Sequence, residues 1–382
     1  MSLSLPASDG SSSVIELTPR PDLDVSATPP RSRTVYAASH VVADPVSTSI
    51  VSGAIDWEAT LSLRRDIWSV GLGIAESMDT AQRSMGLTGA DAMELARLTL
   101  TEDPRDGGGT VVGVNTDQLK PGDTSLDDIT GAYAQQLEFV ESLGGTAVIM
   151  ASRHLAATAR TADDYLSVYS RLLANTDRPV ILHWLGSVFD PALDGYWGDP
   201  DPAAALETVL QLISQNASRI AGIKISLLDP RYEIELRQRI PSGIPVFTGD
   251  DFNYTDMIAG DGNGHSHALL GAFAALAPWA SAALKALDSG DENGFRTVLG
   301  PTEQLSRLIF QRPTQYYKVG IAWLAYLTGK QSHFRMLGGL EAGRDLSYLA
   351  ELIRCADAIS YFPDPEFTEQ RARMYFAAQG LG

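Results

Sequence analysis

Short apolar runs rich in β-branched residues alternate with longer amphipathic runs from residue 33 onward. The short runs predict strands and the longer ones predict helices, because their apolar residues recur with different periods. Clear helical patterns occupy residues 126–143, 163–175, 202–215 and 231–239. The predicted strands cover residues 34–38, 71–75, 110–115, 146–150, 179–185, 220–226, 244–248 and 265–270.

Strands that alternate with helices in this number, over roughly 250 residues, are typical of a (β/α)8 or TIM barrel. We therefore predict an α/β fold with the barrel at residues 31–280. An open, doubly wound sheet shows the same alternation, but its phosphate-binding fingerprint is missing here. Gly262 and Gly264 are not followed by a third glycine at the required spacing, and no predicted strand closely precedes them.

The two ends of the chain differ from this pattern. After Pro278 the strand signals stop, and amphipathic runs predict a C-terminal all-helical domain at residues 281–382. Its helices are expected at residues 278–287, 291–311, 313–328, 344–359 and 366–379. Residues 1–30 lack the basic start and apolar run of a signal peptide. Because they are rich in Ser, Pro, Asp and Thr, we expect them to form a mobile tail.

Charge and cysteine content narrow the choice of partners. The 29 Lys and Arg residues against 47 Asp and Glu give a formal net charge of −18, which repels nucleic acids and anionic lipids. The longest uncharged stretch, residues 268–284, contains Pro278 and is shorter than the about 20 apolar residues of a membrane span. The single Cys355 cannot form an internal disulfide. We therefore expect a cytoplasmic protein without nucleic-acid or membrane partners.

A lysine stands inside the predicted strand at residues 220–226. Because side chains point alternately to the two faces of a strand, Lys224 faces the barrel interior when Ile223 and Ile225 pack outward. Burial lowers the pKa of an amine, and a neutral amine can attack a carbonyl carbon to form a Schiff base. These residues alone are equally consistent with a lysine that reaches water or a carboxylate at the strand end.

Five segments, in the same order along the chain, resemble the dihydrodipicolinate synthase / N-acetylneuraminate lyase family. Residues 221–224 (Ala-Gly-Ile-Lys) are similar to its lysine strand, and residues 245–251 to its Gly-Asp-Asp segment. Residues 264–271 are similar to its glycine-rich eighth strand. Residues 55–58 and 71–77 are similar to its early Asp-plus-aromatic segment and its Gly-Thr-Thr-Gly-Glu loop. The resemblance covers residues 33–300 and implies a class I aldolase barrel, Lys224 as the Schiff-base lysine and a homo-oligomer.

The chain also departs from that family at specific positions. Gly73 and Ile74 stand where the family has two threonines, and His183 replaces its tyrosine at the end of the fifth strand. Ser187 and Val188 occupy the place of the arginine that would hold a second carboxylate. The resemblance therefore implies a divergent branch, and we expect a function other than that of a standard pyruvate-dependent dihydrodipicolinate synthase.

His183 is the candidate for proton transfer. It shares the inward phase of Ile181 and Leu185, one predicted strand before Lys224. An imidazole with an ordinary pKa near ~6.5 suits proton transfer at neutral pH, so we expect a histidine-like ionisation in the rate. A hydrogen-bonded core histidine is the structural alternative.

Other polar side chains near strand ends are candidates for substrate binding. Arg153 and His154 suit an acidic or hydroxylated substrate, or alternatively a salt bridge at the barrel rim. The carboxylates suit substrate hydroxyls, or alternatively a helix cap and hydrogen bonds to neighbouring groups. The full set of candidates is Glu76, Arg153, His154, Asp250, Asp251 and Ser266.

A divalent metal site is a rival interpretation. His265 and His267, two residues apart, project to one face of a strand, and Asp250 and Asp251 end the neighbouring strand. With His183 these residues would suit a metal-dependent hydrolase, isomerase or class II aldolase. A barrel that binds a ligand without catalysis is a third interpretation.

We favour a Schiff-base aldolase or lyase that acts on a small carbonyl compound, either a keto acid or a sugar-derived ketone. Lys224 is the expected nucleophile and His183 the expected proton shuttle. This chemistry needs neither a cofactor nor a metal, because the protonated imine itself withdraws the electrons of the breaking bond.

Overall fold

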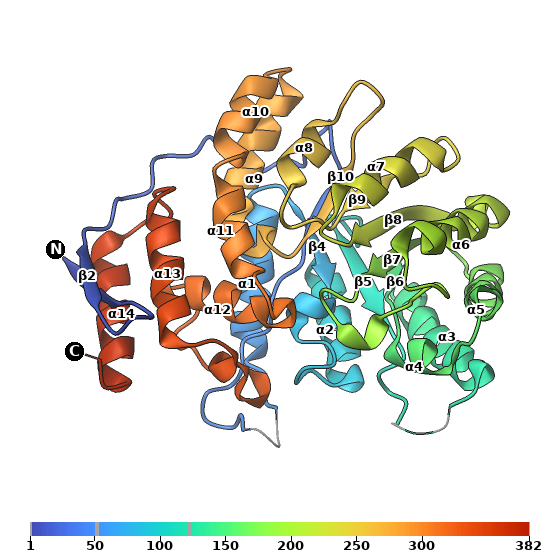
Figure 1. Ribbon diagram of the computed structural model, residues 1–382, viewed down its shortest axis with the longest axis horizontal. Helices are drawn as coiled ribbons and strands as arrows, with labels where there is room; N and C mark the ends of the chain where they lie inside the picture. The colour runs from blue at the N-terminus through green and yellow to red at the C-terminus, as the bar shows by residue number, and fades with distance from the viewer. Residues whose placement is uncertain (1, 50–52, 121, 123, 382) are drawn as a thin grey trace.

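The computed structural model describes every residue except 1, 50–52, 121, 123 and 382. In this part of the chain, eight parallel strands close into a barrel, in the order β10-β3-β4-β5-β6-β7-β8-β9 (Figure 1). The strands are β3 (Val35–Ala37), β4 (Gly73–Glu76), β5 (Thr110–Val114), β6 (Thr146–Ile149), β7 (Val180–Leu185), β8 (Ile220–Ser226), β9 (Val246–Thr248) and β10 (His267–Leu270). Each overlaps a predicted strand, so the prediction of a TIM barrel is confirmed.

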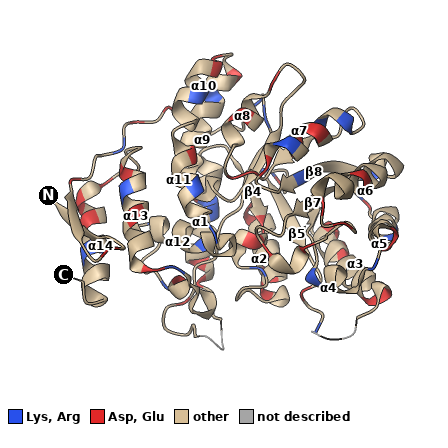
Figure 2. Cartoon of the chain, in the orientation of Figure 1, with Lys and Arg blue, Asp and Glu red and all other residues tan. Residues whose placement is uncertain are grey.

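Helices cover the outside of the barrel (Figure 1). Their starts follow the sequence: the side chains of Ser125 and Asp128 form a capping box, and Asp201 caps the helix that begins at Pro202. Lys, Arg, Asp and Glu lie on these outer helices, and α7 (Pro230–Arg239) carries charges of both signs (Figure 2). The helices between β3 and β10 are α1 (Trp57–Ser69), α2 (Gly89–Glu102), α3 (Leu126–Ser142), α4 (Arg153–Thr158), α5 (Ala162–Ala174), α6 (Pro202–Gln215), α7 (Pro230–Arg239) and α8 (Tyr254–Ala259).

The barrel interior is a packed apolar core rather than a pore. Alternation along β8 sends Ile223 and Ile225 outward into the layer between strands and helices, as predicted. The inward side chains form a separate cluster beneath the carboxyl ends of the strands. It consists of Ala38, Ala75, Met78, Val111, Val148, Met150, Ile181, Phe247 and Leu269.

The C-terminal part of the chain is helical, as predicted, but its helices begin and end elsewhere. Helix α9 (Phe273–Asp288) follows β10 directly and continues through Pro278, so it spans the proposed domain boundary at residue 280. The single helix expected at residues 291–311 is divided into α10 and α11, because Pro301 cannot donate a backbone hydrogen bond. These helices are α10 (Glu292–Leu299), α11 (Thr302–Ile309), α12 (Tyr317–Leu327), α13 (Leu346–Asp357) and α14 (Pro365–Ala378).

The expected mobile tail instead contains a hairpin of β1 (Leu3–Pro6) and β2 (Ser12–Ile15). Leu3 and Leu5 are buried, and Figure 1 shows the hairpin beside α13 and α14. Leu3 and Leu5 lie on the same face of β1, and burying these two apolar side chains stabilises the hairpin against the helices. The overall polar composition of the segment does not show this alternation. Further along, Ser26 bonds to Ser281 and the Ser32 amide bonds to Asp288, so the segment also follows α9.

No helix in the described ranges of the chain is long and apolar enough to cross a membrane.

Glu76, a predicted substrate-binding residue, forms a buried ion pair with Arg64. The Arg64 Nε lies 2.8 Å from Oε2, the second guanidinium contact to Oε1 is 2.9 Å, and both side chains are fully buried. The Thr99 hydroxyl and the Ser77 amide also donate to this carboxylate. With these bonds made, Glu76 joins α1 and α2 to β4, so its position is structural rather than that of a substrate ligand.

Replacing Arg64 tests this position. Arg64→Met leaves the Glu76 carboxylate buried without its cation, so the free energy of unfolding should fall by about 3–5 kcal/mol. Arg65 on the same helix is 43% exposed and pairs with Glu58 and Glu102, so Arg65→Met should change the free energy of unfolding by less than about 1 kcal/mol. Urea unfolding of both variants provides the measurement, and equal losses would contradict the structural assignment.

Candidate active site

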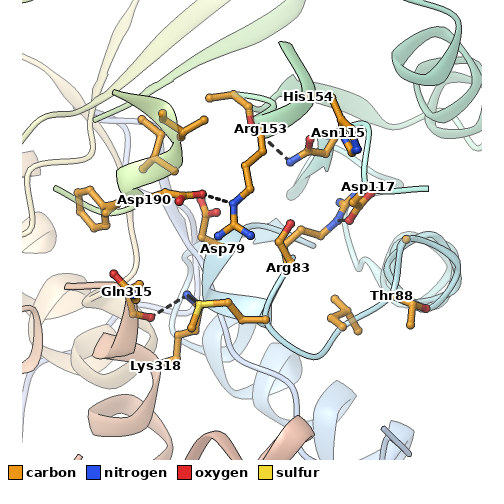
Figure 3. Close-up of a pocket in the computed structure, with 18 of the residues that line it drawn as sticks. Asp79, Arg83, Thr88, Asn115, Asp117, Arg153, His154, Asp190, Gln315 and Lys318 are labelled. Atoms are coloured by element: carbon orange, nitrogen blue, oxygen red, sulfur yellow. Dashed lines mark hydrogen bonds and ion pairs between the residues drawn. The ribbon is translucent and has the colours of Figure 1, made fainter. Parts of the chain in front are cut away.

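A cavity of about 520 Å³ opens at the carboxyl ends of the barrel strands (Figure 3). This end of a TIM barrel is where loops after the strands gather polar side chains. Loops after β4, β5, β6 and β7 form most of the wall, and α12 closes one side. The polar and charged residues that line it include Asp79, Arg83, Asn115, Asp117, Arg153, His154, Asp190, Gln315, Tyr317 and Lys318.

Lys224 lies on β8 directly opposite His183 on β7, and both side chains are buried. The lysine passes over Gly249, where an added Cβ would lie 2.7 Å from the lysine Cε. Burial lowers the pKa of Lys224, although the carboxylates of Asp79 and Asp251 oppose this effect. Asp79 also lines the cavity, so this carboxylate connects the lysine with the space available to a ligand.

The two neighbouring aspartates after β9 have different positions. Asp251 is buried near Lys224 and accepts a 2.9 Å hydrogen bond from the Ala272 amide. Burial raises the pKa of the Asp251 carboxyl, against the opposing effects of that amide and Lys224. Asp250 instead accepts hydrogen bonds from Asn253 and the Phe252 amide. These bonds organise the turn before α8, and this predicted substrate-binding residue does not line the cavity.

His183 is completely buried, and its Nε2 lies 3.2 Å from the Ser226 hydroxyl. Its Nδ1 has no hydrogen-bond partner among the described residues. Burial lowers the pKa of His183 well below 6.5, and the nearby charge of Lys224 lowers it further. Burial therefore favours an imidazole that is neutral at neutral pH, which differs from the expected histidine-like ionisation in the rate.

Arg153 and His154, two of the predicted substrate-binding residues, line the cavity, since both follow the end of β6. The Arg153 Nε is 2.5 Å from Asp190 Oδ2, and the side chain remains 47% exposed. His154 Nδ1 lies 3.0 Å from the Thr116 hydroxyl. Both polar groups can therefore contact a ligand in the cavity.

Ser266 and the two nearby histidines lie away from this cavity. Ser266 directly precedes β10 and accepts a hydrogen bond from Arg237 on α7, outside the barrel wall, so the structure does not bring this predicted substrate-binding residue to the cavity. His267 starts β10, and its Nδ1 accepts from the Thr34 amide near the amino end of the barrel. No group of three His, Cys, Asp or Glu side chains in the described ranges can hold a metal ion. His183, His265 and His267 therefore do not form the rival metal site.

Several residues at the site were not predicted from the sequence. Asp79 begins a short 3-10 helix, η1 (Asp79–Ala81), and the Thr80 hydroxyl lies 2.7 Å from that of Tyr317. Tyr317 and Lys318 come from α12, about a hundred residues beyond Lys224 in the chain. The sequence does contain one signal, because Lys318 is the only charged residue within the otherwise apolar α12.

A family model described as "Protein of unknown function (DUF993)" matches residues 3–381. The chain belongs to the DUF993 family. No curated protein sequence matches this DUF993 chain.

Solved structures of the dihydrodipicolinate synthase family share its fold. YagE, a prophage protein of that family from E. coli K12, matches with a TM-score of 0.65 and 17% identity over 86% of this chain and 99% of its own. A putative dihydrodipicolinate synthetase from Pseudomonas aeruginosa has a TM-score of 0.60 and 18% identity over 84% and 99% of the two chains. Dihydrodipicolinate synthase from Aquifex aeolicus has a TM-score of 0.61 and 14% identity over 91% of this chain and 98% of its own. At these identities the resemblance is confirmed for the fold.

Substituting Gly249 tests whether the absence of a Cβ at this residue leaves the room that the Lys224 side chain occupies. The Cβ of Gly249→Ala would collide with the Ser226 hydroxyl and the lysine stem, so we expect a loss of about 1–3 kcal/mol in stability. The amine should also react more slowly with an acylating reagent, measured by peptide mass. Gly131 in α3 has open space around its Cα, so Gly131→Ala is the control and should not slow this labelling. Unchanged Lys224 labelling in Gly249→Ala would contradict the proposed positioning.

The protonation state of His183 can be measured directly. Because its pKa is lowered, the native imidazole should show no titration between pH 6 and 8 in nuclear magnetic resonance spectra. His183→Phe assigns the signal, and the same residue in the urea-unfolded chain should titrate near ~6.5. A native midpoint near that value would overturn the assignment of a neutral imidazole.

Proposed function

We propose that the protein is a class I aldolase or lyase that forms a Schiff base between Lys224 and a small carbonyl compound. The observation that carries this proposal is the position of Lys224: buried on an inward phase of β8, with a lowered pKa, beside Asp79 and Asp251. Support also comes from the fold shared with dihydrodipicolinate synthases. One of these neighbours, YagE, is in complex with pyruvate.

In the proposed reaction the neutral Lys224 amine attacks the carbonyl carbon, and the carbonyl oxygen takes up a proton to give a carbinolamine. Loss of that hydroxyl as water gives the protonated imine. This iminium accepts the electron pair of an adjacent bond when that bond breaks, and returns it when a bond forms. Each step needs a group that accepts a proton from the amine and returns one to the departing oxygen.

Asp251 suits that proton transfer because its raised pKa lets the carboxyl hold a proton closer to neutral pH. His183 has a supporting role, since its neutral imidazole can accept or donate a hydrogen bond at Nε2 without adding charge beside Lys224. Its hydrogen bond to Ser226 fixes the ring next to the lysine. We therefore assign proton transfer to Asp251 and a hydrogen-bonding, positioning role to His183.

The substrate is proposed to differ from pyruvate. Gly73 and Ile74 stand in β4 where the resemblance would place two threonines, and neither side chain has a hydroxyl group. No arginine follows β7, whose next residues are Gly186, Ser187 and Val188. Two lost hydrogen bonds to a carboxylate cost about 1.5–3 kcal/mol each, so pyruvate should bind roughly a hundredfold or more weakly than in an enzyme that makes them.

Reductive trapping tests the nucleophile. Borohydride with a panel of keto acids and sugar-derived ketones should add one substrate, less the carbonyl oxygen, to Lys224, as measured by intact and peptide mass. Lys224→Ala should abolish the adduct and lower turnover by roughly a thousandfold or more. Lys285→Ala is the matched control, since this surface lysine pairs only with Asp24 among the described residues.

A fully active Lys224→Ala enzyme would overturn the proposal, as would activity that appears only with an added divalent metal. Pyruvate should give little adduct, whereas the cognate carbonyl compound should label completely. The cytoplasmic location and the homo-oligomeric state stay predictions, and light scattering checks the second.

A further inference from the structure

Lys318 is a second buried lysine, and unlike Lys224 it is among the residues that line the cavity; the Schiff-base step does not use it. Its side chain is almost completely buried on α12, and its Nζ lies 3.1 Å from the Gln315 carbonyl oxygen and 3.5 Å from Met85 Sδ. The ammonium also stands 4.7 Å from the centroid of the Tyr317 ring. An ammonium has three donors, and within the described part of the chain only one oxygen accepts from it.

Arg153 faces the same space with unused donors. Its Nε bonds to Asp190, while its two terminal nitrogens have no hydrogen-bond partner in the described ranges. Figure 3 shows the Arg153 guanidinium and the Lys318 amine extending into the cavity from different walls. Arg83 provides a contrast, because Asp117, Gln136 and two carbonyl oxygens already accept from its guanidinium.

The charges around Lys318 do not offset its burial. Burial lowers the pKa of Lys318 to about 8, although the carboxylates of Asp79 and Asp190 oppose the shift and Arg153 adds to it. Asp190 is already paired with Arg153, and Asp79 acts on Lys224 as well. Within the described part of the chain no carboxylate accepts a hydrogen bond from the ammonium, and an anionic ligand would supply one.

We propose that Lys318 and Arg153 bind an anionic group of the substrate, a phosphate or a carboxylate, at the end remote from the carbonyl that Lys224 attacks. This inference rests on the proposed function for the identity of the ligand as substrate, but the anion site itself does not. The cavity of about 520 Å³ suits a small molecule, and it is lined by Arg153, Lys318 and also Asp79, whose carboxylate acts on Lys224. The C-terminal helices thereby contribute to substrate specificity.

Sulfate binding measured by calorimetry tests the anion site without the reaction. Sulfate keeps two charges from pH 6 to pH 10, so any loss of affinity in that range reports on the protein. Wild-type affinity should fall as the pH rises through and above about 8, because the Lys318 ammonium loses its proton there. Lys318→Met keeps the stem, weakens binding roughly tenfold or more, and removes that pH dependence.

Two matched variants complete the design. Arg153→Gln, at a half-exposed position, should also weaken sulfate binding but should keep the fall in affinity above pH 8. Lys285→Met, on the surface of α9, should bind sulfate as the wild type does. Unchanged affinity in both Lys318→Met and Arg153→Gln, or no sulfate binding by the wild type, would overturn the proposal.

The type of anion is determined by comparing glycerol phosphate with malonate. Tighter binding of one of them, lost in Lys318→Met, identifies the substrate group as a phosphate or a carboxylate. Failure of the proposed function is distinguishable from failure of the anion site. If no carbonyl compound is trapped on Lys224 while the affinity for sulfate still depends on Lys318, only the proposed reaction is wrong. If trapping succeeds and KM for anionic carbonyl compounds is unchanged in Lys318→Met, only the anion site is wrong.

Discussion

The removal of Lys224 from water is the constraint on which the site depends. An amine inside a closed barrel has lost its hydration, so its charged form persists only as far as nearby carboxylates compensate. Those carboxylates come from separate parts of the chain, since Asp79 follows β4 and Asp251 follows β9. Closure of the barrel brings them to the same lysine, and the Ala272 amide at the start of α9 holds Asp251 in place. The balance of burial and charge around one amine is therefore a property of the whole barrel.

The C-terminal helices complete this site rather than merely extending the chain. Tyr317 on α12 bonds to Thr80 beside β4, which fixes the helix over the carboxyl ends of the strands. At its other end the helical part is linked to the barrel by the N-terminal segment, whose Thr18 amide bonds to Asp357 and whose Ser32 amide bonds to Asp288. The wall of the cavity thus depends on contacts between segments that are far apart in the sequence.

Patterns that repeat locally predicted the fold and the inward position of the central residues. Alternation along β7 and β8 is sufficient to place His183 and Lys224 on the inner face, and the register of the parallel strands puts them side by side. The sequence could not show that Arg64 neutralises Glu76, because that contact depends on how α1 packs against β4. Ser266 was misplaced because it stands before β10, where phase along the strand no longer determines direction. Tyr317 and Lys318 were missed because the path of the chain after α9 determines which helix covers the barrel.

The completeness of hydrogen bonding separates structural charges from those available to a ligand. Arg64 and Arg83 are deeply buried, yet carboxylates and carbonyl oxygens accept from each guanidinium, so neither needs a further partner. Lys318 is buried to a similar degree with one oxygen acceptor in the described part of the chain. A buried cation with unused donors costs stability unless something else offsets it, and in a cavity that partner can come from solution. The same comparison separates Asp250, which accepts from three donors and organises a turn, from Asp251, which accepts from one amide and is the residue we propose for proton transfer.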